Sequence, residues 1–376
     1  MKKICYVTTL SVSIRAFFAE QLQYLSENGF DVTVICSPDE ALSSDLGERI
    51  HYIPVAIPRG IHPLGMLRAI RTLKRIFRKE KFDLVQYSTP NAAFCGAIAA
   101  KAAKIPVRNY HLMGLRYLGD TGVKRKILFS LEKLACARST SVECVSPSNL
   151  DLATTAGLFS KEKGTVVWNG SSGGLDIGRF DVGHREEYRQ EIRARYGIPA
   201  DAFVFGFVGR ITRDKGVNEL LRAFAGLENA RLLMVGNEDD VGGLDEMLYK
   251  SSRENAAVIY TGQVPDVERY YAAMDVLVFP SYREGFGNVV MEAAAMGTPA
   301  VISRIPGPID AVKEGITALT VPPKDEKALL GAMEEIRKDG RYLSMSADAV
   351  SHVRACFDSK ILNEKILARK NALLKG

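Results

Sequence analysis

Residues 276–300 read VLVFPSYREGFGNVVMEAAAMGTPA, and this stretch decides the fold class. The apolar run 276–279 predicts a buried strand, and the Ala-rich run that begins at Asn288 predicts a helix. The loop between them carries the turn Gly285-Phe286-Gly287. A helix N-terminus beside this loop offers free backbone N–H groups and the positive end of a dipole. The stretch therefore predicts a binding site for a phosphate.

Two carboxylates stand eight positions apart on either side of this turn, at Glu284 and Glu292. Glu284 falls in the loop beside the expected anion, and Glu292 falls about one helical turn beyond Asn288. Phosphates between two carboxylates that can bind hydroxyl groups suit a nucleotide-sugar, with ribose on one side and hexose on the other. The alternative is that both acids simply face water, as most charged residues do.

Length and composition set the outer limits. The chain has 376 residues, of which 47% are apolar and 25% are charged. This length suits two domains of about 180 residues each, in an ordinary globular protein with ample core. No apolar run reaches the ~18 residues that a membrane span needs. The six cysteines are scattered without a C-x-x-C pair, which favours reduced thiols in a cytosolic protein over a metal or redox site.

The net charge of +6 is unevenly distributed along the chain. Residues 1–180 hold 24 Lys and Arg against 15 Asp and Glu, which gives +9, whereas the remainder holds 26 against 29, which gives −3. A basic first half beside a slightly acidic second half indicates that the first half meets an anionic partner. Nucleic acid is not the expected partner, because no recognised nucleic-acid module and no interleaved aromatic residues occur.

Strands and helices alternate in both halves, which predicts parallel sheets with helices on both faces. Expected strands lie at 4–8, 32–36, 84–88, 107–110, 144–146, 203–209, 231–236, 257–260, 276–279 and 300–303. Expected helices lie at 17–28, 64–79, 92–103, 217–227, 244–253, 267–274, 288–296, 326–337 and 359–374. Residues 169–190, rich in Gly, Ser and Asp, are the expected linker. The predicted fold is α/β, with two Rossmann-like doubly wound domains facing a central cleft.

The segment Gly209-Arg210-Ile211-Thr212-Arg213-Asp214-Lys215-Gly216 follows the first strand of the second half. It lacks the G-x-x-x-x-G-K-[ST] pattern of a P-loop. It still places Arg210 and Lys215 at the carboxyl edge of a strand, where two cations can neutralise a diphosphate leaving group. The alternative is a pair of solvated surface cations.

Together, segments 209–216, 282–287 and 292–301 resemble the donor-site signature of the retaining GT-B glycosyltransferases of family 4. The resemblance implies an acceptor-binding domain at 1–178, onto which 359–376 packs back, and a donor-binding domain at 179–358. It implies catalytic roles for Glu284, His111, Arg210 and Lys215. It implies donor contacts from Arg210, Lys215, Val264, Glu284, Gly285, Phe286, Gly287, Asn288, Val289 and Glu292. Backbone groups near Val264 would hold the base.

Candidate polar residues in the first half follow its strands. The loop after the first strand, residues 8–15, has no glycine, so Ser11, Ser13 and Arg15 are its candidate donors to a phosphate or acceptor. A catalytic histidine often follows the strand near 107–110 in the broader family, which implies this role for His111, with Arg116 nearby. The alternative for His111 is a hydrogen-bonded core or turn histidine. The segment 169–176 is either a hinge or a ligand contact.

A basic amphipathic stretch covers residues 64–79, where Leu67, Ile70, Leu73, Ile76 and Phe77 can share one face. Arg and Lys cover the rest, and 124–126 adds a second basic cluster. The stretch is either an ordinary surface helix or one that also touches anionic lipid headgroups. The second reading predicts a cytoplasmic protein bound peripherally to the inner face of the cell membrane.

The resemblance implies a retaining glycosyltransferase of surface polysaccharide or glycan biosynthesis. It would move an N-acetylhexosamine or related sugar from a UDP-sugar to a sugar on undecaprenyl diphosphate, with no cofactor and no metal. Alternatives are a non-hydrolysing UDP-sugar epimerase of the same fold and a glycosyltransferase with a soluble acceptor. More distant ones are a glycoside hydrolase, which also uses two carboxylates, and a nucleotide-binding scaffold without activity. A nicotinamide-dependent dehydrogenase is disfavoured, since neither half shows G-x-G-x-x-G after its first strand.

Overall fold

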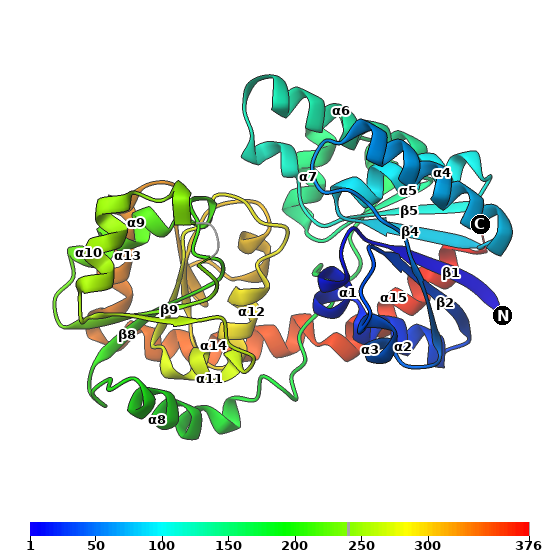
Figure 1. Cartoon of the computed structure of the whole chain (residues 1–376). Helices are drawn as coiled ribbons and strands as arrows, with labels where there is room; N and C mark the ends of the chain where they lie inside the picture. The colour runs from blue at the N-terminus through cyan, green and yellow to red at the C-terminus, as the bar shows by residue number, and fades with distance from the viewer. Residues whose placement is uncertain (239–240, 376) are drawn as a thin grey trace. The chain divides into compact units, whose positions relative to one another are not determined.

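The computed structural model describes residues 1–238 and 241–375, and the chain divides into two compact units (Figure 1). Unit 1 contains residues 1–174 together with the end of the chain from residue 359, and unit 2 contains residues 175–358. The sequence analysis placed the first boundary after residue 178 instead. Assigning acceptor binding to one unit and donor binding to the other stays a prediction.

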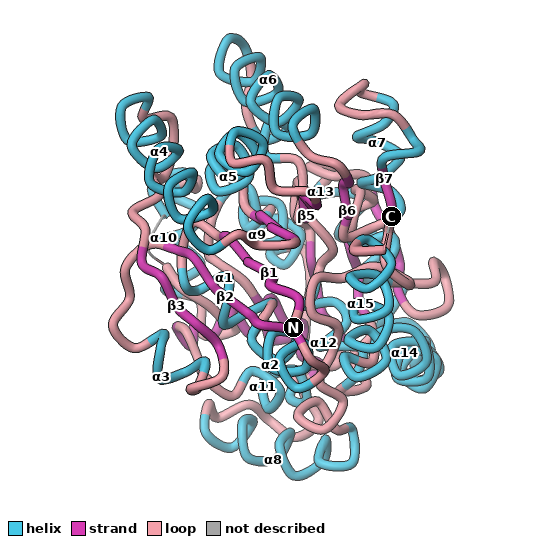
Figure 2. The backbone as a smooth tube through the Cα atoms, turned by 90° about the vertical axis from the view of Figure 1, so that its right-hand side faces the viewer, coloured by secondary structure: helices cyan, strands magenta, loops and turns pink. Residues whose placement is uncertain are grey.

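Unit 1 is built on a parallel sheet with strand order β3-β2-β1-β4-β5-β6-β7. Its strands are β1 Lys2–Val7, β2 Phe30–Cys36, β3 Ile50–Pro54, β4 Leu84–Ser88, β5 Val107–Leu112, β6 Ser141–Cys144 and β7 Gly164–Thr165. Figure 2 shows β1, β2 and β3 side by side at one side of this sheet. The chain order reverses between β1 and β4, as in doubly wound proteins.

Helices cover both faces of this sheet. They are α1 Ser11–Phe17, α2 Ala19–Glu27, α3 Leu42–Leu46, α4 Pro63–Glu80, α5 Pro90–Ala102, α6 Gly122–Arg138, α7 Pro147–Thr155 and α15 Ser359–Leu373. One apolar core lies under α4, α5 and α6, and another lies under α1, α2 and α3, with residues of α15 packed against it. The central strands are therefore buried on both sides, which explains the apolar run at 4–7 in β1.

Unit 2 repeats the arrangement with a parallel sheet of order β10-β9-β8-β11-β12-β13. Its strands are β8 Phe203–Val208, β9 Ala230–Val235, β10 Val258–Gly262, β11 Val276–Phe279, β12 Ala300–Ser303 and β13 Ala318–Val321. Its helices are α8 Arg185–Arg195, α9 Val217–Ala225, α10 Glu246–Glu254, α11 Val267–Ala273, α12 Asn288–Ala295, α13 Glu326–Arg337 and α14 Arg341–Phe357. The chain order reverses between β8 and β11, so the loops after these neighbouring strands meet at one edge.

Several predicted elements were wrong, each for a local reason. The strand expected at 144–146 is β6, at Ser141–Cys144, because this buried strand carries two polar residues that pair inside the core. The linker expected at 169–190 ends earlier, because the highly charged helix α8 begins at Arg185. The loop expected at 8–15 is wrong from Ser11 onward, where α1 begins. The sequence analysis also missed β3, β7, β13, α3, α6, α7 and α14.

The buried face of α4 differs from the predicted one. Its buried residues are Met66, Ala69, Leu73 and Phe77, whereas Leu67 is 42% exposed. The helix therefore presents Leu67 to the surrounding medium beside its arginines. Among the residues that the structure describes, no helix is both long enough and apolar enough to cross a membrane.

Candidate functional site

In unit 2, the structure brings Lys215 and Glu284 together. Lys215 follows β8 and Glu284 follows β11, and these strands are neighbours in the sheet. The Lys215 Nζ lies 2.5 Å from Glu284 Oε1, and the Ser281 hydroxyl donates to the same oxygen at 2.7 Å. Both charged side chains are largely buried, with 18% and 16% exposed. Such a partly buried pair is screened less by salt than a surface pair.

Backbone contacts hold these two loops against each other. The Tyr282 N–H donates to the carbonyl of Asp214 at 2.9 Å, and the Ser281 hydroxyl lies 3.3 Å from the same oxygen. Gly216 has a φ of +72°, and a Cβ added there would lie 2.1 Å from the carbonyl oxygen of Pro280. Only glycine fits so close an approach at this backbone angle. The spacing between the two loops is therefore built into the backbone.

The predicted anion site lies where α12 begins. Gly287 precedes the helix with a φ of +98°, and Asn288 and Val289 form its first turn, both half-buried. Phe286 is buried and stacks edge-to-face on Phe357, with 5.3 Å between ring centroids. Phe286 thus packs in the core of unit 2, and its contact with a donor would come from its backbone.

Glu292 lies one turn into α12 and meets a neighbouring helix. Its Oε2 accepts a hydrogen bond of 2.8 Å from the Tyr271 hydroxyl of α11. Burial raises the pKa of Glu292, and the hydrogen bond from Tyr271 lowers it in part. The carboxylate is half-buried and held by a donor, so it is pre-oriented to accept a second hydrogen bond.

Arg210 and Val264 lie farther from the pair formed by Lys215 and Glu284. The Arg210 guanidinium is 60% exposed and lies 3.6 Å from Asp214, which also lies 3.6 Å from Arg283. Val264 is half-buried in the loop after β10, and β9 separates β10 from β8 in the sheet. The structure therefore brings Lys215 and Glu284 together, four residues before α12 begins, with Arg210 more exposed and Val264 farther along the same edge of the sheet.

In unit 1, His111 is the penultimate residue of β5 and is buried, with 7% of its surface exposed. Its Nε2 lies 3.2 Å from the Ser172 hydroxyl, and its Nδ1 lies 3.9 Å from Glu143 Oε2. The Phe18 ring stacks edge-to-face on the imidazole. Burial lowers the pKa of His111, and the Glu143 carboxylate opposes this shift. The imidazole is hydrogen-bonded in the core, as the alternative interpretation expected, and it also faces a charged partner.

The other candidates of unit 1 have different settings. Ser13 and Arg15 lie on α1, so the prediction that they are loop residues is wrong. Arg15 pairs with Asp39 at 2.7 Å and with Asp45 at 2.5 Å, and its guanidinium holds the pKa of Asp39 well below its usual range. Arg15 is thus already compensated by two carboxylates. Arg116 is half-buried in the short turn Arg116–Gly119.

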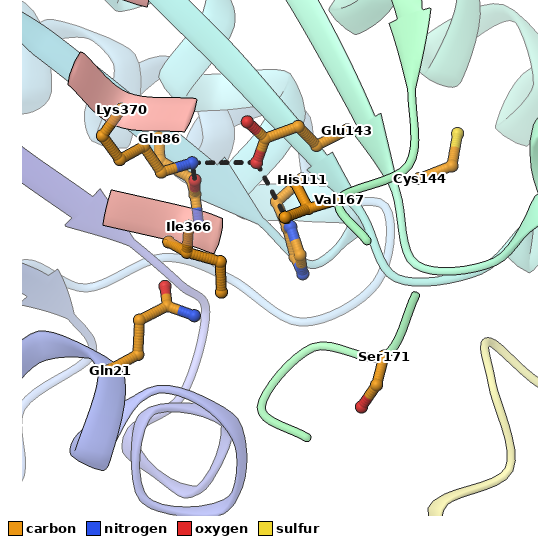
Figure 3. A pocket seen from close by; sticks show the side chains of 9 residues that line it. All are labelled: Gln21, Gln86, His111, Glu143, Cys144, Val167, Ser171, Ile366 and Lys370. Carbon is orange, nitrogen blue, oxygen red and sulfur yellow. Dashed lines mark hydrogen bonds and ion pairs between the residues drawn. The ribbon is translucent and has the colours of Figure 1, made fainter. Parts of the chain in front are cut away.

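Three residues that the sequence did not single out, Gln86, Glu143 and Lys370, form a buried polar cluster with His111 in unit 1 (Figure 3). The Lys370 Nζ donates to Gln86 at 2.6 Å and to Glu143 at 2.8 Å. A polar residue inside each of three buried strands was the available signal. Lys370 carried none, because one lysine on a basic helix looks like any solvated cation.

Two protein families match the chain, one within each unit. The family described as "Glycosyltransferase Family 4" matches residues 16–171, and "Glycosyl transferases group 1" matches residues 188–351. A capsular polysaccharide biosynthesis glycosyltransferase, CapM of Staphylococcus aureus, is 31% identical over 382 residues, covering 100% of this chain and 98% of CapM. The chain belongs to family 4 of the GT-B glycosyltransferases. This family 4 glycosyltransferase is accordingly an enzyme of the sugar-transferring class.

Two further proteins are similar to this family 4 glycosyltransferase. The N,N'-diacetylbacillosaminyl-diphospho-undecaprenol alpha-1,3-N-acetylgalactosaminyltransferase of Campylobacter jejuni is 25% identical, and the match covers 100% of each chain. The crystal structure of Anabaena HepE in complex with UDP and glucose superposes with a TM-score of 0.80 at 20% identity, over 99% of this chain and 100% of HepE. The second likeness confirms the predicted fold class.

Proposed function

We propose that this enzyme is a retaining glycosyltransferase that takes a UDP-sugar, with an N-acetylhexosamine or related sugar, as its donor. The observation that carries the proposal is the contact of Lys215 with Glu284 at one edge of the unit 2 sheet, four residues before α12 begins. A diphosphate between a lysine and a helix N-terminus gains charge-assisted hydrogen bonds and a favourable dipole. The complex of HepE with UDP and glucose supports UDP as the nucleotide.

Each site residue has a proposed role. Arg210, Lys215 and the first N–H groups of α12 would balance the charge of the diphosphate, so the proposal requires no metal ion and no cofactor. Glu292 would accept hydrogen bonds from the ribose hydroxyls, and Glu284 would hold the donor hexose. The backbone near Val264 would hold the base.

In the proposed transfer, the acceptor oxygen takes the place of the UDP oxygen on the same face of the sugar. The bond between the anomeric carbon and the UDP oxygen breaks, and a bond from that carbon to the acceptor oxygen forms. The acceptor's proton passes to the departing phosphate. Stabilising the charge of that phosphate lowers the barrier, which gives Lys215 and Arg210 their catalytic role.

The proposed acceptor is a sugar on undecaprenyl diphosphate, in the assembly of a surface polysaccharide. The names of the relatives from Staphylococcus aureus and Campylobacter jejuni support this class of pathway and carrier. The exposed face of α4 in unit 1 supports an acceptor at a membrane. On this face Leu64 is 74% exposed and Leu67 is 42% exposed, and the exposed basic residues beside them are Arg68, Arg71 and Arg75. Exposed apolar and basic side chains on one helix suit an anionic bilayer surface. The enzyme would then work at the inner face of the cell membrane.

Helix α6 adds to this proposed membrane face. Val123 is 73% exposed and Ile127 41%, and they flank the basic run 124–126. Helices α4 and α6 both pack on α5, so both belong to the helical layer on one side of the unit 1 sheet (Figure 1). Two helices in one layer would bind a bilayer more tightly than one, because their charges act together.

The test begins with donor binding. Thermal unfolding is measured with UDP, GDP, dTDP, ADP, NAD and a panel of UDP-sugars, for the native chain and for Lys215→Ala. A ligand at about 100 times its Kd raises stability by about 2.7 kcal/mol, which gives a clear shift of the midpoint. The proposal expects a shift with UDP ligands that Lys215→Ala abolishes. A shift with NAD alone, or with no UDP compound, contradicts it.

The second step tests the acceptor and the stereochemistry. The UDP-sugar that binds is offered a polyprenyl-diphosphate-linked sugar and the matching free sugar, and the anomeric configuration of the product is read by NMR. Retained configuration on the lipid-linked acceptor supports the proposal. Interconversion of the UDP-sugar without any acceptor would indicate an epimerase instead. Transfer to the free sugar alone would indicate a soluble acceptor.

A further inference from the structure

The last helix of the chain places a lysine inside unit 1. Lys370 of α15 is 1% exposed, and its ammonium group donates to Glu143 Oε2 at 2.8 Å and to Gln86 Oε1 at 2.6 Å. A buried ammonium group persists only when it is paired and hydrogen-bonded. Lys370 meets both conditions, so its charge belongs to the core of unit 1 and not to its surface.

Strand register places the partners of Lys370 on one side of the sheet. His111 of β5 lies directly opposite Glu143 of β6, and Gln86 of β4 lies opposite Asn109, two residues before His111. Side chains two apart on a strand share a face. Figure 3 shows the result, in which the Glu143 carboxylate lies between the Lys370 ammonium group and the His111 imidazole.

One oxygen of Glu143 therefore serves two ionisable partners, Lys370 and His111, while Arg369 lies near the other oxygen. Its Oε2 lies 2.8 Å from Lys370 Nζ and 3.9 Å from His111 Nδ1. Burial alone would raise the pKa of Glu143, but Lys370 and His111 together hold it well below its usual range. An ionised carboxylate beside Nδ1 favours the imidazole form that carries its proton on that nitrogen. Nε2 is then left as a hydrogen-bond acceptor.

We propose that Glu143 and Lys370 are positioning residues for His111, through which the C-terminal helix sets the tautomer and proton affinity of a histidine at the end of β5. The charge of Glu143, 3.9 Å from Nδ1, favours the proton on that nitrogen, although the two atoms are too far apart for a hydrogen bond. Lys370 helps to hold Glu143 ionised. Nε2, which lies 3.2 Å from the Ser172 hydroxyl, is thereby kept ready to accept a proton or hydrogen bond. The inference rests on the proposed function only through the transfer reaction itself, in which the sequence predicts a part for His111.

The two charges act on His111 in opposite directions. The carboxylate of Glu143 raises the pKa of His111, whereas burial and the nearby ammonium group of Lys370 lower it. A residue that merely filled space would not shift the pKa of His111. The other titratable groups around this cluster are Arg369, 3.5 Å from Glu143 Oε1, the Cys144 thiol and the Tyr6 phenol.

The test is an NMR titration of the full-length chain, which follows the ring nitrogens of its five histidines. The signal of His111 is assigned as the one lost in His111→Gln. In the native chain above the His111 midpoint, the expected form carries its proton on Nδ1. Finding the proton on Nε2 overturns the proposal, and this measurement needs no variant that could fail to fold.

Variants then test each charge separately. The His111 midpoint is expected to move to lower pH in Glu143→Gln. In Lys370→Met, where Glu143 loses its ammonium partner, the imidazole is expected to lose its preference for a proton on Nδ1. Lys365→Met is the matched control, because Lys365 is an exposed lysine on the same helix, and it should leave the midpoint unchanged. Circular dichroism checks that each variant is folded. A shift to higher pH or no shift in folded Glu143→Gln, or an unchanged preference for the Nδ1 proton in folded Lys370→Met, overturns the proposal.

This readout is independent of the donor and of activity. Failure of UDP binding would remove the proposed function and leave the titration result standing. Conversely, a normal transfer reaction with an unmoved His111 midpoint would remove only this inference. If both hold, Lys370→Met should shift the pH profile of kcat with little change in KM for the donor, and Lys370→Arg should restore the native profile in part.

Discussion

Lys215 pairs with Glu284, which lies four residues before α12 begins, so we propose that its ammonium group meets a phosphate of the donor. We expect Lys215→Ala to weaken UDP binding by about 1.5–3 kcal/mol, the usual worth of a charge-assisted contact. Calorimetric titration with UDP measures this loss. Lys327→Ala, at an exposed position on α13, is the matched control and should leave the affinity unchanged. Equal affinity in both variants would contradict the role given to Lys215.

Glu292 allows a prediction about pH at the same scale. Because burial raises its pKa in the folded chain, the unfolded chain releases this proton more readily. At a pH above the raised pKa, the ionised Glu292 therefore lowers the free energy of unfolding. This destabilisation disappears as the pH falls below the pKa that the carboxyl group has in the unfolded chain. We expect Glu292→Gln to be at least as stable as the native chain at pH 8, and to bind UDP more weakly.

Thermal midpoints of both proteins at pH 8 and pH 4.5 check this expectation. The advantage of the variant should shrink at the lower pH, where the native carboxyl also becomes neutral. The stability of the variant is compared with that of the native chain at each pH. If the variant compares less favourably at pH 8 than at pH 4.5, the raised pKa of Glu292 is contradicted. Unchanged UDP affinity would separately contradict the contact with ribose.

At the scale of elements, α15 is a structural part of unit 1 despite its distance in the sequence. Ile366 is 5% exposed, so we expect Ile366→Ala to cost about 2–5 kcal/mol of stability through lost burial and a cavity. Ile361, 37% exposed on the same helix, is the matched control, and its alanine variant should cost under about 0.5 kcal/mol.

The measurement follows urea unfolding by the fluorescence of Trp168, the one tryptophan of the chain, which lies in unit 1. A large loss for Ile366→Ala in this signal ties α15 to the unit that contains the tryptophan. Equal losses for the two alanine variants would show that α15 does not contribute its buried face to unit 1 in solution.

Helix α4 supports a prediction about membranes. Reversing Arg68, Arg71 and Arg75 to Glu should strongly reduce sedimentation with anionic liposomes, since each basic residue near such a surface contributes about 1 kcal/mol. Binding of the native chain should fall as salt rises. Reversal of the exposed Lys250, Lys327 and Lys338 of unit 2 makes the same charge change and is the control. Equal loss in both triple variants would indicate a nonspecific charge effect.

At the scale of the whole molecule, donor binding should protect two separate stretches of backbone. We expect UDP to slow hydrogen exchange in the loop after β8, residues 209–216, and at the start of α12, residues 284–290. The reason is that a bound diphosphate would occupy the N–H groups and charges that converge there. Mass spectrometry of peptides with and without UDP measures this. Protection confined to other segments of unit 2 would contradict the placement of the donor.

Much of the fold was readable from the sequence because the decisive signals are local. The strands at 84–88, 276–279 and 300–303 and the helix at 326–337 are predicted with their observed bounds. Elements were missed where polar residues interrupt the pattern, as in β6, or where apolar residues are few, as in α8. In both cases a distant partner, Lys370 for β6 and Asp275 for α8, makes the buried charge tolerable.

The sequence by itself determined the family, the two α/β units and the strand-loop-helix unit at 276–300, because each depends on residues near one another in the chain. Only the tertiary structure decided which charges meet. Lys215 reaches Glu284 across 69 positions and Lys370 reaches Glu143 across 227 positions. Parallel sheets bring distant segments to one edge through their crossovers, and no local pattern records which side chains then share a buried space.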